Sequence, residues 1–362
     1  MHEVMVLGAG KIGSLVAKLL AYTKDYNVHL IDVGITETVI NISSKYENIH
    51  VSEMDCSQKN RLIKYINEKG IKSVVSCLPF YCNSLIAEVV CEVGINYFDL
   101  TEDVAVTNFI KDLSYDSPGY FVTQCGLAPG FISIVANDLL GTFDDADTVK
   151  MRVGALPVNI SNSLQYALNW STAGIINEYT KKCIALENGE IVTKYALEGL
   201  EEIKVDGLTY EAFNTSGGVG SLVSSVIGKV KNMDYKTIRY PGHCEKMKFL
   251  MHELRLGHRP DLLQDVLENS LPVVSQDVVL VYVSVQGRMG MDMVEKNYTK
   301  KFYPRMIGGK TWSAIQMCTA SGICATLDLV LNGQINLSSN FVRQEDISLS
   351  SFIGNRFGGY FS

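Results

Sequence analysis

The stretch VMVLGAGKIGSLVAKLL at residues 4–20, followed by VHLID at 28–32, decides the fold expected for this chain. A short apolar run at 4–7 ends in a glycine turn, and from residue 12 apolar residues recur at helical spacing. A second apolar run at 28–31 ends in Asp32. The order strand, glycine turn, helix, strand is typical of a dinucleotide-binding βαβ unit.

Each glycine of the turn has an expected task. Gly8 allows the tight turn, Gly10 lets the backbone approach a pyrophosphate, and Gly13 lets the helix pack against its strand. The phosphates then meet N–H groups at the positive end of the helix. The predicted cofactor site comprises Gly8, Ala9, Gly10, Lys11, Ile12 and Gly13. The alternative is a turn whose glycines serve packing alone.

Asp32 bears on the choice of nicotinamide cofactor. A carboxylate at this position accepts hydrogen bonds from the two hydroxyls of the adenosine ribose and repels a 2′-phosphate. No arginine follows among residues 33–35 to receive that phosphate. The sequence therefore predicts NAD as the cofactor, with NADP less favoured.

Length and charge limit the function classes. A chain of 362 residues, 47% hydrophobic and 20% charged, is long enough for two domains with separate cores. The net charge is −7 and no block rich in Lys or Arg occurs, which argues against a nucleic-acid or anionic-membrane surface. No uninterrupted apolar run approaches the length of a membrane span. We expect a small-molecule substrate and neither a nucleic-acid nor a membrane partner.

The nine cysteines are an odd number without a CxxC pair, which indicates free thiols. A reducing compartment fits this pattern, and the first strand begins without a charged leader. We therefore expect a cytoplasmic protein. The histidines and glutamates at 243–258 include no pair with the i,i+4 spacing of a helical zinc site, so no metal is expected.

Strand and helix patterns alternate through residue 128, which predicts an α/β fold with a Rossmann-type, doubly wound parallel sheet. In residues 129–308 the pairs Asn188-Gly189 and Asp206-Gly207 are hairpin signals. This part is predicted to be an inserted α+β substrate domain on a mostly antiparallel sheet, which is able to pair across a homodimer. Residues 309–362, a long helical pattern and a tail, are expected to return to the first domain.

In parallel sheets of this kind, ligands bind beyond the carboxyl ends of the strands. Segments that directly follow two of the expected strands are therefore assigned to the cofactor site. They are Cys77, Leu78 and Pro79 after one strand, and Gly126 after another.

Five motifs together resemble a known family. They are GAGKIG at 8–13 with Asp32, INYFDLTEDV at 95–104, GLAPGF at 126–131, LTYEAFNTSGG at 208–218 and TIRYPGHCEKM at 237–247. The combination resembles the saccharopine dehydrogenase family, above all its glutamate-forming saccharopine dehydrogenases and lysine 6-dehydrogenases. The likeness runs nearly end to end, because the tail at 341–360 also resembles the family's ending.

The resemblance implies NAD(P)-dependent oxidation of an amino-acid C–N bond to an imine, which water then splits. Saccharopine would give glutamate and aminoadipate semialdehyde, a step of lysine metabolism. The alternatives are a lysine 6-dehydrogenase that releases ammonia, a carboxynorspermidine-type dehydrogenase, and a catalytically silent NAD-binding sensor. NADP-using saccharopine reductases tend to carry Arg where this chain has Asp32. The resemblance also implies that Asp55, Cys56 and Ser57 border the adenine.

Three residues are assigned to the substrate's charged groups. A guanidinium holds a carboxylate through two parallel hydrogen bonds, and Arg239 is the candidate for the α-carboxylate. The alternative is a surface Arg paired with an acid. The oxidised nitrogen must lose a proton, so Asp99, at the end of a strand, is expected to act as acid–base group, with Glu102 beside the substrate. The alternative is that Asp99 or Asp103 caps the next helix.

Three further residues are assigned near the substrate. His243 follows Pro241-Gly242, on a loop before an expected helix, and is predicted to lie near Arg239 as a base; the alternative is a local hydrogen bond. Asn169 and Trp170 end an expected strand and are predicted to contact the substrate's chain. The alternative for Trp170 is core or interface packing.

Overall fold

The computed structural model describes residues 1–335, 337 and 339–362. The chain divides into two compact units: residues 1–130 with 318–362, and residues 131–317. The predicted boundaries were 128/129 and 308/309. The second division of the structure falls inside the long helix α11 (Ala314–Leu331).

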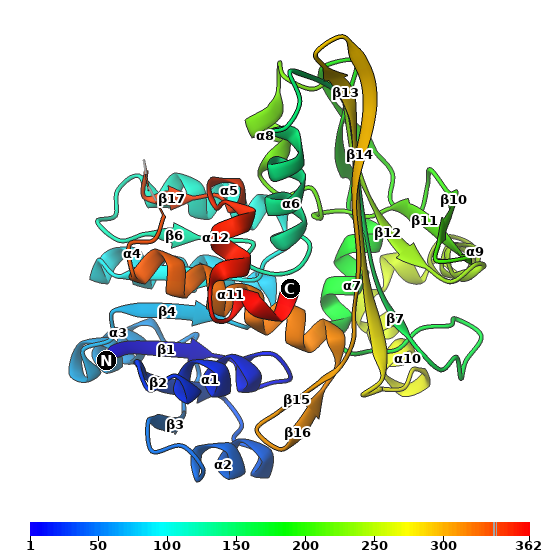
Figure 1. Cartoon of the computed structure of the whole chain (residues 1–362). Coiled ribbons are helices and arrows are strands. Elements are labelled where there is room, and N and C mark those ends of the chain that lie inside the picture. Colours follow the sequence, from blue (N-terminus) through cyan, green and yellow to red (C-terminus); the bar gives the residue numbers. More distant parts are fainter. Residues whose placement is uncertain (336, 338) are drawn as a thin grey trace. The chain divides into compact units, whose positions relative to one another are not determined.

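The first unit is built on a seven-stranded parallel sheet in the order β17-β6-β5-β4-β1-β2-β3 (Figure 1). Its strands are β1 (His2–Leu7), β2 (Tyr26–Asp32), β3 (Ile49–Glu53), β4 (Ser73–Ser76), β5 (Asn96–Asp99), β6 (Phe121–Val122) and β17 (Phe341–Val342). The strand order reverses between β1 and β4, where such sheets bind ligands. The predicted doubly wound Rossmann-type sheet is confirmed.

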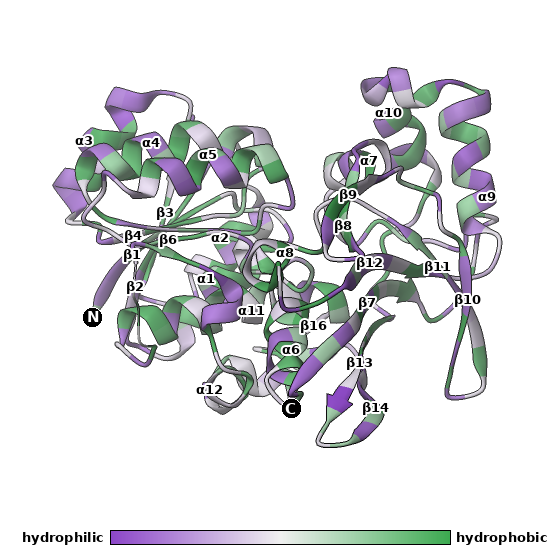
Figure 2. Cartoon of the chain, turned by 90° about the horizontal axis from the view of Figure 1, so that it is seen from above, coloured by the Kyte–Doolittle hydropathy of each residue, from purple (hydrophilic) through white to green (hydrophobic). Residues whose placement is uncertain are grey.

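Helices cover both faces of this sheet. Figure 2 shows α3 (Lys59–Lys69), α4 (Asn83–Val93) and α5 (Val104–Ser114) along one face, with α1 (Gly13–Tyr22) and α11 along the other. The remaining helices are α2 (Glu37–Ser43), α12 (Leu349–Gly354) and the 3₁₀ turns η1 (Phe80–Cys82), η4 (Gln344–Asp346) and η5 (Gly358–Phe361). Because both faces are covered, residues 4–7 of β1 and 74–75 of β4 are fully buried.

The second unit is built on an eight-stranded sheet in the order β10-β11-β12-β7-β13-β14, in which β8 pairs with β12 and β9 with β8. Its strands are β7 (Asp145–Pro157), β8 (Cys183–Glu187), β9 (Glu190–Lys194), β10 (Glu201–Val205), β11 (Leu208–Asn214), β12 (Asn232–Arg239), β13 (Asp277–Met289) and β14 (Asp292–Phe302). β12 and β7 pair in parallel, and the other pairs are antiparallel. The predicted mostly antiparallel α+β domain is confirmed.

The helices of the second unit are α6 (Phe131–Leu140), α7 (Thr172–Thr180), α8 (Leu222–Val226), α9 (His243–Lys248), the π turn η2 (Phe249–Glu253), the 3₁₀ turn η3 (Leu256–His258) and α10 (Pro260–Ser270). A small hairpin, β15 (Arg305–Ile307) and β16 (Lys310–Trp312), precedes α11. Apolar side chains of α7, α9 and α10 form one core cluster with Phe213 of β11. Ile238 of β12 and Tyr210 of β11 belong to a different cluster, so alternate residues of these strands face opposite sides of the sheet.

The two predicted hairpin turns are present. Asn188 and Gly189 join β8 to β9, and Asp206 and Gly207 join β10 to β11. All four have positive φ, between 52° and 84°, as a type I′ turn requires.

The prediction of a strand that ends at Asn169 and Trp170 is wrong. Residues 158–171 contain neither helix nor strand between β7 and α7. Side-chain hydrogen bonds replace a β ladder there: Asn169 donates to Asp277 (3.2 Å) and accepts from the N–H of Val274 (2.9 Å). Asp277 in turn accepts from the first N–H groups of α11. Through Asp277, Asn169 therefore supports the N-terminus of α11. Its predicted contact with the substrate is not tested by these hydrogen bonds.

Helix α11 has the length and the mean hydropathy of a membrane span, although polar residues such as Gln316 and Asp328 interrupt its apolar residues. Its mean hydropathy is 1.5 over 18 residues, and in the described part of the chain it is the one helix of this kind. Since 78% of that window is buried inside the protein, a core helix explains the composition equally well.

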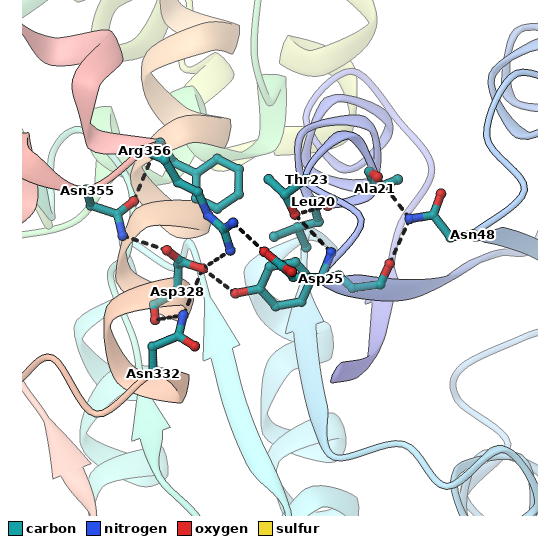
Figure 3. Close-up of polar contacts among 11 residues, drawn as sticks. Leu20, Ala21, Thr23, Asp25, Asn48, Asp328, Asn332, Asn355 and Arg356 are labelled. Atoms are coloured by element: carbon teal, nitrogen blue, oxygen red, sulfur yellow. Dashed lines mark hydrogen bonds and ion pairs between the residues drawn. The ribbon is translucent and has the colours of Figure 1, made fainter. Parts of the chain in front are cut away.

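One buried carboxylate ties the C-terminal tail to the first unit. Asp328 of α11 accepts hydrogen bonds from Tyr26 (2.5 Å), Arg356 (2.6 Å) and Asn355 (2.7 Å) (Figure 3). Arg356 also forms an ion pair with Asp25 at the surface. Burial pushes the pKa of Asp328 up, but the hydrogen bonds outweigh burial and leave it below its usual value.

We predict that Asp328→Asn lowers the free energy of unfolding by about 2–4 kcal/mol at neutral pH, because the buried Tyr26 and Asn355 lose their charged partner. Because the pKa of Asp328 is lowered, this contribution is present above about pH 4 and is lost as the pH falls. The control, Asp25→Asn, removes an exposed partner and should cost about 1 kcal/mol or less. Urea unfolding measures both, and equal losses would contradict the assignment.

Candidate functional site

The turn after β1 has the geometry of a dinucleotide site. Gly8 has a φ of +92°, and a Cβ on Gly13 would lie 1.8 Å from the carbonyl oxygen of Gly8. Only glycine therefore allows α1 to pack this closely on the turn. Among the described residues, nothing lies within 4 Å of the Cβ position of Gly10. The turn leaves open the approach that a phosphate needs.

The N-terminus of α1 offers N–H groups to an anion. Ile12 occupies the N-cap and its side chain makes no capping hydrogen bond. In the described part of the chain, the N–H groups of Ile12 and Gly13 donate to no backbone carbonyl, whereas Ser14 already bonds Gly10 (3.1 Å). Lys11, also assigned to the cofactor, is exposed on this turn. Free N–H groups at a helix N-terminus suit a pyrophosphate.

Asp32 lies directly against the glycine turn. One carboxylate oxygen accepts from the N–H of Ala9 (2.6 Å), and the other accepts from Gly34 (3.3 Å). Met54 at the end of β3 donates its N–H to the carbonyl of Asp32 (2.9 Å). The acid at the end of β2 thus lies where the fingerprint requires it.

The other predicted cofactor residues line the same edge of the sheet. A Cβ on Gly8 would contact the carbonyl of Cys77 (2.9 Å) and the side chain of Leu78 (3.4 Å), so this segment walls the turn. Burial, with the charge of Asp32 as a smaller cause, raises the pKa of Cys56 to about 11. Asp55 accepts a hydrogen bond from the N–H of Ser57 (2.9 Å), Pro79 is exposed, and Gly126 is buried.

Asp99, at the end of β5, is fully buried. Its carboxylate accepts from Tyr97 (2.9 Å), from Asn83 (3.3 Å), and from the N–H groups of Thr101 and Gln124 (3.1 Å each). Burial raises the pKa of Asp99 to about 6, although the hydrogen bonds oppose this. The carboxylate joins the segments that follow β4, β5 and β6, so the geometry favours a positioning role over direct contact with substrate.

The helix cap next to Asp99 is made by another acid. Asp103 accepts from the N–H of Val106 (2.9 Å) at the start of α5. Of the two acids for which capping was the alternative, Asp103 is therefore the cap. Glu102, between them, is half-buried.

Arg239, at the end of β12, is buried among aromatic side chains. Its Nε donates to the hydroxyl of Tyr179 (3.0 Å) and its Nη1 to the carbonyl of Ile238 (2.8 Å). The guanidinium lies over the ring of Tyr166, 4.8 Å from the centroid, and 5.9 Å from that of Tyr179. Among the described residues no acid forms an ion pair with it. The predicted alternative, a surface Arg paired with an acid, is wrong, because only 3% of the residue is exposed.

The charge of Arg239 is maintained inside the protein. Burial works against the charged form, but Tyr179, Tyr166 and Glu178 outweigh burial and raise the pKa of Arg239 above its usual value. Arg152, the other buried arginine of this unit's sheet, has two ion pairs, with Glu201 and Asp234 (2.8 Å). Buried charges are normally paired in this way. Arg239 therefore has the environment of an anion-binding group.

His243 begins α9 and lies in the same cluster as Arg239. Its Nδ1 lies 2.7 Å from the carbonyl oxygen of Leu164 and its Nε2 lies 3.1 Å from the hydroxyl of Tyr179. Burial and the charge of Arg239 lower the pKa of His243 to about 3, so the ring is neutral. The predicted proximity to Arg239 is confirmed, and both ring nitrogens are already hydrogen-bonded.

Trp170 reaches this cluster indirectly, by donating to the hydroxyl of Tyr166 (2.8 Å). Sequence reasoning missed Tyr166 and Tyr179, which form the walls around Arg239. A tyrosine count carries no such signal, since the chain has 18 of them. Only the fold brings residues 166, 179, 239 and 243 together.

Comparison with known families decides the class. A model of the saccharopine dehydrogenase NADP binding domain matches residues 4–119, and a model of the saccharopine dehydrogenase C-terminal domain matches residues 126–351. The chain belongs to the saccharopine dehydrogenase family. The resemblance found in the sequence is confirmed, and with it an oxidoreductase that uses a nicotinamide cofactor.

Solved structures show the same fold. Apo saccharopine dehydrogenase (L-Glu forming) from Saccharomyces cerevisiae aligns with a TM-score of 0.77 and 14% identity, over 97% of this chain and 95% of that chain. A probable dehydrogenase from Thermotoga maritima gives a TM-score of 0.46 at 11% identity, over 97% and 94%. At such identities the first match supports the saccharopine dehydrogenase fold alone, and the second carries no argument.

The buried Asp99 yields a pH prediction. A carboxyl whose pKa is raised from about 4 to about 6 by folding stabilises the protein below pH 4 and loses that contribution as the pH rises through 6. The stability of the wild type relative to Asp99→Asn should therefore fall by up to about 3 kcal/mol between pH 4 and about pH 6.5. Urea unfolding across this range measures it. A pH-independent difference would show that Asp99 titrates as in the unfolded chain.

Proposed function

We propose that this member of the saccharopine dehydrogenase family oxidises the C–N bond of an amino acid whose carboxylate binds Arg239. Saccharopine is the leading substrate, and lysine and carboxynorspermidine-type amines are the alternatives. The observation that carries the proposal is the buried, charged guanidinium of Arg239, which forms no ion pair with a described acid, although the charge of the buried Glu178 acts on it. An α-carboxylate would supply the missing partner.

The chemistry follows from the family. The bound nicotinamide supplies the hydride acceptor, and the substrate nitrogen loses a proton as the C–N bond becomes an imine. Water then adds to the imine carbon, and the C–N bond breaks to release an amine and a carbonyl product. The chain's own contribution is orientation: Arg239 would hold the carboxylate end, and the glycine turn would hold the dinucleotide.

Access to Arg239 requires movement of its cover. Tyr166, which stacks on the guanidinium, belongs to the irregular segment 158–171. A segment without helix or strand is displaced more easily than β12 itself. We propose that carboxylate binding displaces the ring of Tyr166 or the segment that carries it.

The two residues assigned as acid–base groups, Asp99 and His243, are both enclosed by the protein. Asp99 is enclosed by four donors, and His243 is 1% exposed with both nitrogens in use. Both residues are therefore better placed to hold neighbouring groups in position than to exchange a proton with the substrate. Their acid–base roles stay predictions, as do the substrate contacts of Glu102, Asn169 and Trp170.

NAD is the cofactor we propose, with NADP less favoured. The family model that matches residues 4–119 is described as NADP binding, whereas Asp32 places a carboxylate against the turn. That charge would repel a 2′-phosphate. Local chemistry of this chain argues for NAD more directly than a family description does.

We predict that Asp32→Asn weakens the preference for NAD over NADP about tenfold or more, since it removes the repulsion worth about 1.4 kcal/mol or more. Asparagine keeps an oxygen for the N–H of Ala9, so the turn is preserved. Asp32→Ala should change the preference in the same direction. Dissociation constants from calorimetry decide, and an unchanged ratio would place Asp32 away from the ribose.

We predict that Arg239→Met lowers kcat/KM for saccharopine, or for lysine, about 100-fold or more, because two charge-assisted hydrogen bonds are lost. Reduction of NAD followed by absorbance measures this. Pentane-1,5-diamine, which is lysine without its carboxylate, is the comparator, and its rate should not respond to the substitution. No turnover with any of these amines and either cofactor, together with NAD binding in calorimetry, would support the silent sensor.

A further inference from the structure

We propose that Tyr179 and His243 are positioning residues that set the orientation in which Arg239 receives a carboxylate. The inference rests on the proposed function, because it concerns the same guanidinium. It goes further by naming the two side chains that fix this guanidinium and the edge that they leave open.

The hydrogen bonds around Tyr179 run in one direction only. His243 is neutral, and its Nδ1 lies 2.7 Å from the carbonyl of Leu164, which can only accept. Nδ1 therefore carries the proton, and Nε2 must accept from the hydroxyl of Tyr179 (3.1 Å). The hydroxyl oxygen is then free to accept from Nε of Arg239 (3.0 Å). In this series of hydrogen bonds, the direction of each bond determines the direction of the next.

This series of hydrogen bonds determines which edge of the Arg239 guanidinium is available to a ligand. The edge formed by Nε and Nη2 is blocked, since Nε already donates to Tyr179. Nη1 gives one hydrogen to the carbonyl of Ile238 and keeps one, and in the described part of the chain Nη2 donates to no protein acceptor. A carboxylate is therefore expected to bind end-on, across Nη1 and Nη2.

Packing alone does not hold the rings in place. A cavity of about 10 Å³, at the lower limit for holding one water molecule, lies beside Tyr179 and His243. Its other walls are Tyr166 and aliphatic side chains of the same core cluster. Empty space next to the rings leaves them room to shift once their hydrogen bonds are removed. Hydrogen bonding is thus a constraint on Arg239 in addition to the contact with the ring of Tyr166.

The same cluster contains a spectroscopic probe. Trp170 is half-buried and donates to Tyr166, whose ring lies under Arg239. The other tryptophan, Trp312, is 2% exposed. In a Trp312→Phe background, the fluorescence of Trp170 reports occupation of Arg239 without any turnover.

The experiment compares three substitutions in that background. Tyr179→Phe removes the hydroxyl, His243→Leu removes the acceptor for it, and His243→Gln returns an acceptor. Tyr210→Phe is the matched control, because Tyr210 is equally buried on the opposite face of the sheet. Each variant is titrated with L-saccharopine, L-lysine and pentane-1,5-diamine, and KM and kcat are measured for any amine that turns over.

Tyr179→Phe and His243→Leu should each weaken binding of the carboxylate-bearing amines about tenfold or more and raise KM to match, and Tyr179→Phe should leave kcat within about threefold. His243→Gln should recover most of the affinity, and Tyr210→Phe should equal the background. The double variant Tyr179→Phe/His243→Leu should be no weaker than the weaker single variant, because both cut one chain. Binding of pentane-1,5-diamine should not respond.

The outcomes separate this inference from the proposed function. Wild-type affinity in both single variants, with Arg239→Met still defective, overturns the positioning role and leaves the carboxylate site standing. Losses equal for all three amines, or kcat losses without a change in KM, also overturn it, because they indicate general disruption. No binding of any carboxylate-bearing amine to the background protein overturns both proposals. Binding without turnover removes the proposed reaction and leaves the positioning role to be decided by the titrations.

Discussion

The close approach of α1 to the glycine turn is the constraint on which the first unit depends. A Cβ at residue 13 would meet the carbonyl of Gly8 at 1.8 Å, and a positive φ is required at Gly8 itself. This approach aims the helix N-terminus at the open space beside Gly10 and lets Asp32 bond the N–H of Ala9. Folding and cofactor recognition therefore use the same backbone geometry.

The second unit contains two buried arginines, whose positive charges the protein stabilises in different ways. Arg152 forms ion pairs with two acids, whereas Arg239 is surrounded by tyrosine rings and by hydroxyl and carbonyl acceptors, and the charge of Glu178 acts on it without an ion pair among the described residues. Those neighbours tolerate the charge without cancelling it. A carboxylate ligand would complete the ion pair, which gives a physical reason for an amino-acid substrate.

Local sequence rules predicted the features that depend on neighbouring residues along the chain. The glycine turn, the hairpins at Asn188-Gly189 and Asp206-Gly207, and the alternating strands of the first unit are of this kind. The rules failed where partners are distant in sequence. Asn169 bonds Asp277, 108 residues away, and no local pattern encodes that contact or the course of the segment around it. The walls of the Arg239 site escaped prediction for the same reason.

A crystal structure of the protein grown with NAD and L-saccharopine, or with L-lysine, tests the central claim most directly. The account predicts a pyrophosphate against Gly10 and the N-terminus of α1, the adenosine ribose on Asp32, and a substrate carboxylate across Nη1 and Nη2 of Arg239. A dinucleotide bound elsewhere, or a substrate carboxylate held by other residues while Arg239 stays enclosed by its tyrosines, would contradict it.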